Sequence, residues 1–292
     1  MAGVKSTLFQ PIGILDSGLG GLSVLADLAA VRPGGHYYYF ADARYAPYGE
    51  KKSEEVRQRA LVVADFLVKK GAKLLLVACN TATSAAVVDL RKLLTIPVVG
   101  MEPALKPAVA SQTHQTVLVA ATPLTLREEK FGALFRQTKG QHEVIPLPCP
   151  GLVEIIENEG PESDAVGEKL KELLAPHRHR QIHRLVLGCT HYVLISPQWQ
   201  QAVGTGTELV DGNTGTVRQV LKVLEERQRP DDLSTVLPVE QQVTHITLIT
   251  SCCRDQSCQL MKTVLMKQLS QRGMKWEDLE NTMRIDVEEE CI

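Results

Sequence analysis

Short apolar runs alternate with segments of helical periodicity along most of the chain. Runs rich in Val, Ile, Leu and Tyr predict strands at residues 12–15, 37–40, 74–78, 98–100, 117–121, 143–147, 185–187, 208–210 and 245–250. Apolar positions spaced three and four apart predict helices at residues 22–30, 53–70, 84–94, 124–135, 163–174, 214–226 and 255–271. This alternation predicts an α/β fold of mostly parallel sheets flanked by helices.

The length of 292 residues, of which 44% are hydrophobic, is enough for two domains of medium size. Three prolines within residues 97–107 indicate a crossover into a second domain, and residues 208–215 indicate the return. We therefore expect residues 1–100 to form a first α/β domain and residues 101–209 a second one. Residues 210–292 would return to the first domain with a C-terminal strand and helix. Residues 227–238 are interpreted as a surface loop, and residues 286–292 as an acidic tail without regular structure.

The charges are nearly balanced, with 32 Lys and Arg against 34 Asp and Glu and a net charge of −2. This balance argues against nucleic acid or an anionic membrane surface as the partner and favours a small molecule. The first residues lack the apolar segment of a signal peptide, and the apolar runs are too short to span a membrane. We therefore expect a cytoplasmic protein whose seven cysteines are free thiols.

Two cysteines stand where an apolar run ends in a polar turn. Cys79 follows residues 74–78 and precedes Asn80 and Thr81, and Cys189 follows Leu187 and Gly188. In open α/β sheets, ligands bind beyond the carboxyl ends of the strands. A helix N-terminus after a cysteine favours its reactive thiolate form. Two copies of this arrangement predict two halves of the chain that face one substrate.

The first predicted strand leads into a glycine-rich turn, Asp16-Ser17-Gly18-Leu19-Gly20-Gly21. Such a turn can present backbone N–H groups to an anion. A dinucleotide fingerprint is the rival interpretation, because Asp42 follows about 20 residues later. Ser23 occupies the third glycine position of that fingerprint, and Asp16 would crowd a pyrophosphate. The turn therefore favours a small carboxylate or amine ligand.

Four motifs together resemble those of bacterial glutamate racemases. They are Asp16-Ser17-Gly18-x-Gly20-Gly21, Pro47-Tyr48-Gly49, Ala78-Cys79-Asn80-Thr81-Ala82 and Gly188-Cys189-Thr190-His191-Tyr192. The resemblance runs from about Ile12 to at least Val220. It implies two similar α/β domains with the active site in the cleft between them. It also implies cofactor-independent interconversion of L- and D-glutamate for peptidoglycan synthesis, by an enzyme that often forms homodimers.

The chemistry of inversion supports two opposed cysteines. Inverting an α-carbon removes a proton from one face and returns one to the other, which two acid/base groups achieve without turning the substrate over. Sulfurs that each lie within reach of the reacting carbon would be roughly 6–8 Å apart, far beyond disulfide length. By the resemblance, Cys79 serves the face from which D-glutamate loses its proton, and Cys189 serves the face used by L-glutamate.

The resemblance also assigns supporting roles. Asp16 and His191 would assist Cys79 and Cys189, while Asp42 and Glu157 fall where the family has further acidic residues. Glu154 lies one helical turn from Glu157, so either could be the functional acid. Short hydroxyl, amide and backbone groups at strand ends and turns would hold the substrate, namely Ser17, Pro47, Tyr48, Gly49, Asn80, Thr81, Thr122, Thr125 and Thr190. No electron sink is evident, so we expect no cofactor.

Other interpretations stay open at the level of sequence. Cys252, Cys253 and Cys258 suggest a metal site, but no fourth ligand stands at zinc spacing, so we expect no metal. A cysteine at a strand end is often a small buried apolar residue, and Cys149 is interpreted in this way. Aspartate racemisation, a one-cysteine nucleophile in an oxidoreductase or hydrolase, and a non-catalytic amino-acid sensor are the alternative functions.

Overall fold

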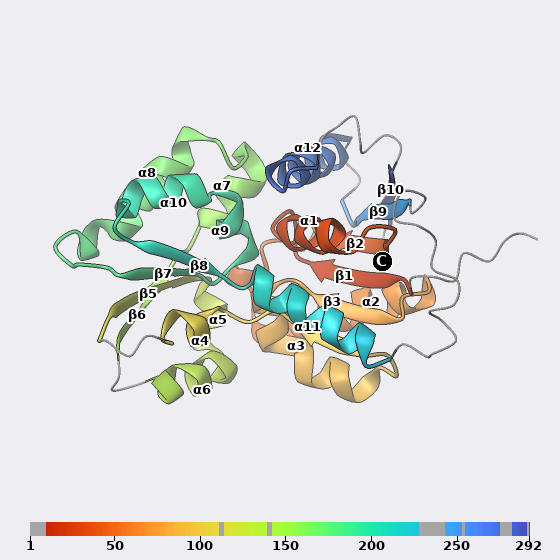
Figure 1. The fold of residues 1–292 in the computed structure, drawn as a ribbon, viewed down its shortest axis with the longest axis horizontal. Coiled ribbons are helices and arrows are strands. Elements are labelled where there is room, and N and C mark those ends of the chain that lie inside the picture. The colour runs from red at the N-terminus through yellow and green to blue at the C-terminus, as the bar shows by residue number, and fades with distance from the viewer. Residues whose placement is uncertain are drawn as a thin grey trace, which may run out of the picture.

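The computed structural model describes residues 10–110, 114–138, 142–227, 243–252, 255–274, 282–290 and 292. These residues form two sheets with helices on both sides (Figure 1). The six-stranded sheet has the order β10-β9-β2-β1-β3-β4, and the four-stranded sheet has the order β6-β5-β7-β8. Every strand pair in the described residues is parallel, which confirms the predicted α/β class.

The first sheet draws strands from both ends of the chain. Its strands are β1 (Ile12–Asp16), β2 (His36–Ala41), β3 (Leu74–Val77), β4 (Val98–Gly100), β9 (Thr244–Thr250) and β10 (Met283–Glu289). The helices around it are α1 (Leu22–Val31), α2 (Ser53–Lys69), α3 (Asn80–Leu93), α11 (Asn213–Glu225) and α12 (Asp255–Gln271), with the 3-10 turn η1 (Tyr48–Glu50).

Both faces of the first sheet are covered, which explains its nearly continuous apolar strands. Ile12 and Ile14 of β1 belong to the cluster that includes Leu25 of α1. Leu15, on the opposite face of the same strand, belongs to the cluster that includes Val63 of α2. Each side of the sheet therefore has its own apolar layer.

The second sheet is built from one continuous stretch of the chain. Its strands are β5 (Thr116–Ala121), β6 (Glu143–Pro148), β7 (Arg184–Leu187) and β8 (Glu208–Asp211). The helical segments of this half are α4 (Leu105–Ala108), α5 (Pro123–Arg127), α6 (Glu129–Thr138), α7 (Leu152–Glu159), α8 (Asp164–Leu174), η2 (Ala175–His177), α9 (Thr190–Leu194) and α10 (Ser196–Val203).

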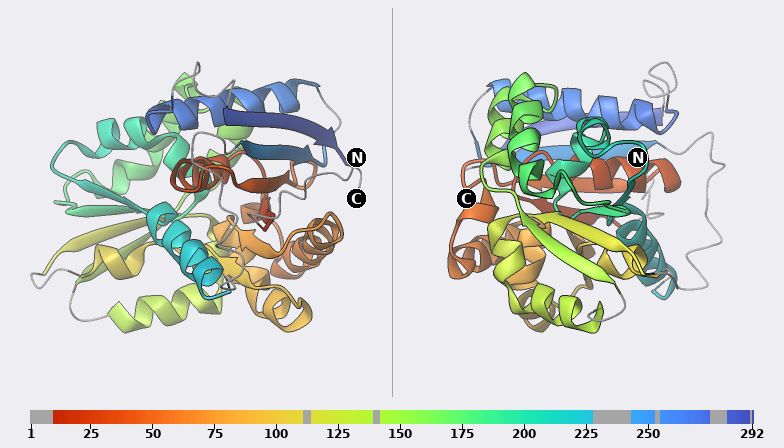
Figure 2. Two further views of the ribbon diagram at one scale, coloured as in Figure 1. Left: turned by 45° about the vertical axis from the view of Figure 1, so that its right-hand side comes forward. Right: turned by 90° about the vertical axis from the view of Figure 1, so that its left-hand side faces the viewer.

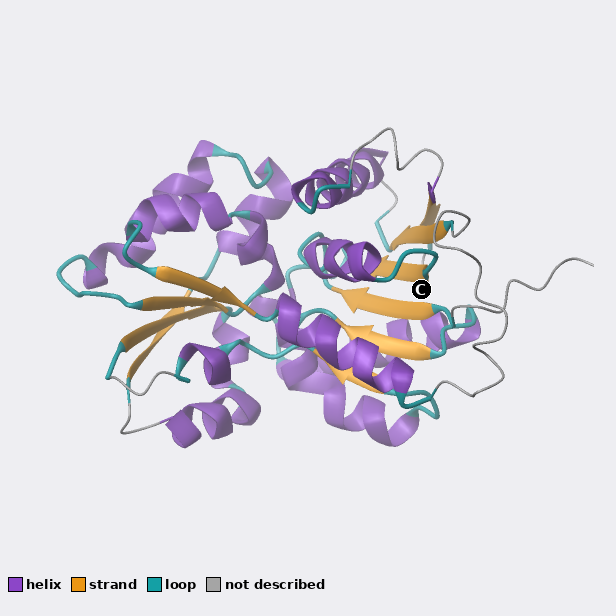
Figure 3. Cartoon of the chain, viewed as in Figure 1, coloured by secondary structure: helices purple, strands orange, loops and turns teal. Residues whose placement is uncertain are grey.

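The arrowheads of both sheets point toward the middle of the molecule in Figure 3, and the left-hand view of Figure 2 also shows the two sheets on opposite sides of it. The carboxyl ends of β1 and β3 therefore face those of β5 and β7. The described chain passes between the halves after β4 and again between β8 and α11. The domain boundaries predicted near residues 100 and 210 stay a prediction.

Two sequence-based expectations are wrong. Residues 286–292 are not a structureless tail, because β10 pairs with β9 from Met283↔Thr244 to Glu289↔Thr250. This strand lies at the sheet edge, where its charges reach solvent, and Glu288 pairs with Lys70 at 2.5 Å. The helix expected at residues 124–135 is interrupted at Glu128, whose extended backbone separates α5 from α6. Most of the expected surface loop lies outside the described residues.

No helix in the described part of the chain is both long enough and apolar enough to cross a bilayer. The short helices α4, α7, α9 and α10 have no counterpart among the sequence-based predictions. Two of them, α7 and α9, contribute to the site described below.

We expect the Leu67→Ala substitution to lower the free energy of unfolding by about 2–5 kcal/mol, because it empties a fully buried position of α2. The control is Val62→Ala on the same helix, where the side chain is 44% exposed. That change should cost no more than about 0.5 kcal/mol. Urea denaturation of both variants measures the difference, and equal losses would contradict the assigned packing.

Candidate active site

Cys79 lies between β3 and α3, where its sulfur serves as the N-cap of the helix. The sulfur accepts a hydrogen bond from Ala82 N at 3.4 Å, and the thiol lies 3.9 Å from Ser17 Oγ. Burial raises the pKa of Cys79, and the nearby Asp16 carboxylate raises it further. The lowering expected from the helix N-terminus is therefore outweighed, and the thiol form is favoured.

Cys189 lies at the end of β7 and begins a relay of side chains. Its sulfur is 3.8 Å from His191 Nδ1, and His191 Nε2 is 2.5 Å from Glu157 Oε1. Burial opposes a charge on His191, but its hydrogen bonds with Cys189 and Glu157 outweigh that cost and raise its pKa well above the usual value. These two contacts favour the charged imidazolium form of His191. The acid in contact with it is Glu157, not Glu154.

The glycine-rich turn follows β1 and is fixed by buried polar groups. Asp16 Oδ2 accepts a hydrogen bond from Gly21 N at 2.7 Å, and the Tyr39 hydroxyl donates to Gly18 O at 2.6 Å. Burial raises the pKa of Asp16, although His191 acts in the opposite direction. The second oxygen of Asp16 is buried without a hydrogen-bond partner among the described residues.

Glycines allow the two halves of the site to approach each other closely. A Cβ added at Gly18 would lie 2.0 Å from Glu157 Oε1, and one added at Gly20 would lie 2.5 Å from His191 N. A Cβ at Gly49 would lie 2.5 Å from the Thr122 Cβ. Contacts this short with His191 N and the Thr122 Cβ require glycine at positions 20 and 49, whereas a side chain at position 18 would have to displace the Glu157 carboxylate. Leu19 N also donates to Glu157 Oε1 at 2.7 Å, across the same junction.

Asp42 is held in a cluster beside the first cysteine. Its Oδ2 accepts from the Tyr48 hydroxyl at 2.5 Å, and its Oδ1 accepts from Arg59 Nη2 at 2.8 Å. Burial raises the pKa of Tyr48 strongly, and Asp42 and Cys79 add to this effect. The side-chain hydrogen bonds of Asp42 go to Tyr48 and Arg59, so its carboxylate has the contacts of a group that orients Tyr48.

Several predicted substrate-binding groups are buried together with unused hydrogen-bonding capacity. Both polar atoms of the Asn80 side chain and the Thr190 hydroxyl have no partner within the described structure. The hydroxyls of Thr81, Thr122 and Thr125 form a triangle with sides of 2.9 to 3.1 Å. Unsatisfied buried polar groups are costly, so they indicate a polar ligand. Ser17 is buried beside Cys79, and Pro47 directly precedes η1.

Tyr39 and Arg59 are site residues that sequence reasoning missed. Tyr39 is one of three consecutive tyrosines interpreted as strand and core residues, and it is indeed fully buried. Only its hydroxyl reaches the glycine-rich turn. Arg59 lies on the amphipathic helix α2 and stacks on the Tyr45 ring, with its guanidinium carbon 3.7 Å from the ring centroid. Neither has a local sequence signal that separates it from an ordinary helix or strand residue.

The remaining cysteines form no evident second site. Within the described residues, no group of three or more His, Cys, Asp or Glu side chains could hold a metal ion. Cys253, one of the three residues considered for a metal site, lies outside the described residues. Cys149 is buried and free of disulfide bonding, and burial raises its pKa to about 12. Its thiol donates to Leu147 O at 3.3 Å, as expected for a structural residue.

Comparison with known proteins gives a consistent result. A family model described as Asp/Glu/Hydantoin racemase matches residues 22–220. The glutamate racemase of Clostridium perfringens (strain SM101) is 47% identical over 224 residues, which cover 76% of this chain and 86% of that protein. The glutamate racemase of Clostridium botulinum (strain Hall) is 40% identical over 242 residues, which cover 83% of this chain and 91% of that protein.

Solved structures agree in fold. The Escherichia coli glutamate racemase in complex with L-glutamate and activator UDP-MurNAc-Ala aligns with a TM-score of 0.75 and 27% identity, covering 96% of this chain and 98% of that one. An aspartate racemase from Picrophilus torridus, at 12% identity and a TM-score of 0.51, shares the fold alone. The chain therefore belongs to the Asp/Glu/Hydantoin racemase family and, within it, groups with the glutamate racemases.

Proposed function

We propose that this protein interconverts L- and D-glutamate by proton transfer between Cys79 and Cys189, without a cofactor. The observation that carries the proposal is the pair of buried thiols at the carboxyl ends of two facing parallel sheets. Cys79 follows β3 of the first sheet, and Cys189 follows β7 of the second. Each thiol also has its own acidic support, Asp16 for Cys79 and the His191–Glu157 pair for Cys189.

The reaction is written in balanced steps. The Cys189 thiolate takes the α-proton of L-glutamate, which leaves a carbanion at Cα and a neutral Cys189 thiol. The Cys79 thiol then donates its proton to the opposite face of Cα, which gives D-glutamate and a Cys79 thiolate. The reverse direction exchanges these roles. The two proton transfers avoid any need for the substrate to turn over in the site.

The electrostatics of the site suit this starting state. Burial raises the pKa of Cys79, which favours its proton-donating form. A charged His191 beside Cys189 is the kind of partner that stabilises a thiolate. Cys79 is therefore suited to give a proton to the carbanion formed from L-glutamate.

The polar groups of the site suit a substrate with two carboxylates and an ammonium. Asn80 and Thr190 offer unused donors in a buried space, and the Thr81–Thr122–Thr125 triangle lies at the junction of the two halves. Preorganised donors of this kind would stabilise the charge that develops on the substrate during proton abstraction. Asp16, with one unpartnered oxygen, is placed to accept from the substrate ammonium.

The cellular setting is part of the same proposal. We propose a cytoplasmic enzyme that supplies D-glutamate for peptidoglycan synthesis and acts as a homodimer. The close similarity to glutamate racemases supports this assignment. Aspartate racemisation is the second candidate, and substrate length distinguishes the two.

Replacing either cysteine by serine should lower racemisation by about 1,000-fold or more, because a serine hydroxyl is a far weaker acid than a thiol. The measurement follows the α-proton of L- and D-glutamate by NMR in deuterium oxide, without added cofactor, and includes aspartate as a parallel substrate. Slow exchange of a single enantiomer is compatible with the remaining cysteine. Full activity in either variant would rule out the two-base mechanism, and exchange of aspartate alone would assign the other substrate.

Glu157→Gln should lower kcat by about 10- to 100-fold, because a neutral amide cannot balance the charge on His191. Glu154→Gln, one turn away on α7, is the matched control and should stay within about 2-fold of the wild type, because the carboxylate that contacts His191 is that of Glu157. Steady-state kinetics on both variants decide between the two acids. The opposite pattern would assign the role to Glu154.

The charge on His191 should also appear in the pH dependence of stability. Because the folded-state pKa is raised, His191 stabilises the fold fully below its unfolded pKa of about 6.5 and less as pH rises through the folded value. The difference in unfolding free energy between the wild type and His191→Asn should thus be largest near pH 6 and shrink toward pH 9. Thermal or urea unfolding across this range measures it. A difference that is independent of pH would contradict a charged His191.

A further inference from the structure

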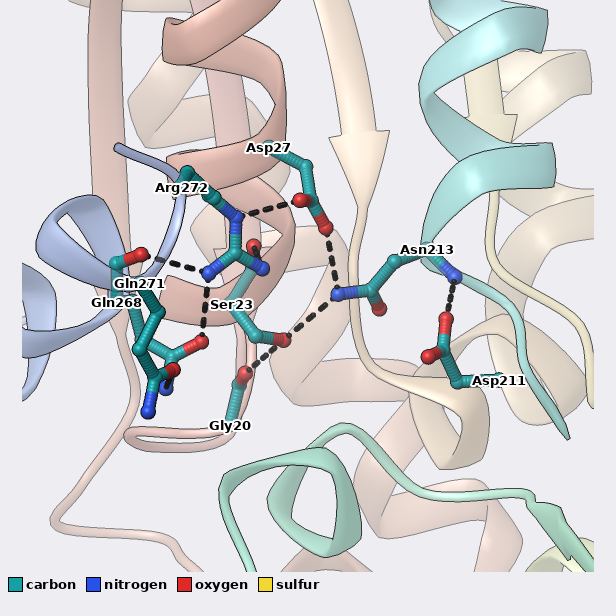
Figure 4. A network of polar contacts seen from close by, with 8 residues as sticks. All are labelled: Gly20, Ser23, Asp27, Asp211, Asn213, Gln268, Gln271 and Arg272. Atoms are coloured by element: carbon teal, nitrogen blue, oxygen red, sulfur yellow. Dashed lines mark hydrogen bonds and ion pairs between the residues drawn. The ribbon is translucent and has the colours of Figure 1, made fainter. Parts of the chain in front are cut away.

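A buried polar network lies directly behind the glycine-rich turn (Figure 4). Asn213, the first residue of α11, donates through Nδ2 to Ser23 Oγ at 3.1 Å and to Asp27 Oδ2 at 2.9 Å. Ser23 Oγ in turn donates to Gly20 O at 3.0 Å. Both Nδ2 hydrogens of Asn213 and the single hydroxyl hydrogen of Ser23 are therefore used. These hydrogen bonds thus connect the start of α11 with Gly20 of the glycine-rich turn.

The same network is tied to the C-terminal part of the chain. Arg272, just after α12, donates from Nε to Asp27 Oδ1 at 2.5 Å and from Nη2 to Ser23 O at 3.1 Å. Asn213 N also bonds to Asp211 Oδ1 at 2.8 Å, which fixes the start of α11 to the end of β8. Ser23 and Asn213 are both buried, so water does not compete for these bonds. Three helices are thus joined at one point behind Gly20.

Gly20 packs closely against residues of the second half of the site. A Cβ at this position would lie 2.5 Å from both His191 N and Thr190 Oγ1, and 2.6 Å from His191 Nδ1. His191 Nδ1 is the atom nearest the Cys189 sulfur in the relay. A shift of the Gly20 peptide would therefore reach the Cys189 side of the reaction directly.

The Cys79 side is held by different bonds. β1 and β3 lie side by side in the first sheet, and Ala78 N donates to Leu15 O at 2.9 Å. Asp16 and Cys79 follow these two residues. Loss of the Ser23–Asn213 bond leaves that ladder unchanged. The backbone of Cys79 is thus held by a ladder outside the network, whereas Asp16 is tied to the turn by the hydrogen bond from Gly21 N.

We propose that Ser23 and Asn213 are positioning residues that set the Gly20 turn against His191 and so tune the proton transfer at Cys189. The inference rests on the proposed racemisation of glutamate by two cysteines. Neither residue contacts the reacting groups. Each acts through the backbone of Gly20, and Arg272 holds the network in place from the other side.

Ordinary kinetics cannot test this point, because two enantiomers have equal free energy and kcat/KM must fall by the same factor in both directions. The primary deuterium isotope effect on kcat/KM can separate the two transfers. Deuterium at the α-carbon of L-glutamate reports on proton abstraction by Cys189. Deuterium at the α-carbon of D-glutamate reports on proton abstraction by Cys79. A change confined to the Cys189 step moves the two isotope effects in opposite directions.

The experiment compares Asn213→Ala, Ser23→Ala and the double variant with the wild type. We expect kcat/KM to fall by about 10-fold or more in each, since small displacements of catalytic groups have large effects. The isotope effect should rise for labelled L-glutamate and fall toward one for labelled D-glutamate. The double variant should lose no more activity than the worse single variant, because both changes break one chain of bonds.

Val220→Ala is the control, because Val220 is fully buried on the same helix α11 and its truncation destabilises the fold without touching the network. It should leave both isotope effects unchanged at a temperature where the protein is folded. Equal isotope effects in Asn213→Ala and the wild type, or the same shift in Val220→Ala, would overturn the inference. A wild-type protein that exchanges no α-proton of glutamate would instead overturn the proposed function.

Discussion

The close approach of the two sheet ends at glycine positions is the constraint on which the site depends. Gly18, Gly20 and Gly49 bring the first half of the molecule against Glu157, His191 and Thr122 at distances that no Cβ could occupy. Because the backbones come so close, polar groups from both halves share one buried space. A side chain at Gly20 or Gly49 would collide with His191 N or Thr122, and one at Gly18 would displace the Glu157 carboxylate.

That shared space explains the unusual electrostatics. Asp16 and Cys79 have raised pKa values because burial penalises their charged forms, and His191 has a raised pKa because a carboxylate and a sulfur bind its proton. The two sides of the site thus differ. The first half favours the protonated form of the Cys79 sulfur. The second half places the imidazole of His191, whose pKa is raised, beside the Cys189 sulfur. Separation of acid and base forms on the two sides of a substrate is what inversion of a carbon centre requires.

Most of the architecture could be predicted from the sequence, because buried parallel strands leave a clear signal. Strands β1 to β9 all appear as apolar runs, and the two cysteines stand at the ends of two of them. β10 was not predicted, because an edge strand tolerates many charged residues and its sequence therefore resembles a disordered acidic tail. The break between α5 and α6 at Glu128 changes no apolar spacing, so periodicity cannot reveal it.

The site was predictable where motifs are local and unpredictable where they are not. Cys79 and Asn80 are adjacent in the sequence, and Cys189 and His191 are two positions apart. Ser23 and Asn213 lie 190 positions apart, and nothing in either segment alone points to the other. The choice between Glu154 and Glu157 is of the same kind, since it depends on which side chain meets His191 across the junction.

The strands of the first sheet come from two stretches of the chain that the second sheet separates, and this order has a consequence for biogenesis. Gly34 N bonds to Thr244 Oγ1 over 210 positions, and β2 lies between β1 and β9. A ribosome therefore completes all four strands of the second sheet before β9 emerges, and until then one edge of β2 in the nascent polypeptide lacks its neighbour. Contacts this distant form slowly. The two strands that complete the sheet carrying Cys79 are thus translated after the whole second sheet.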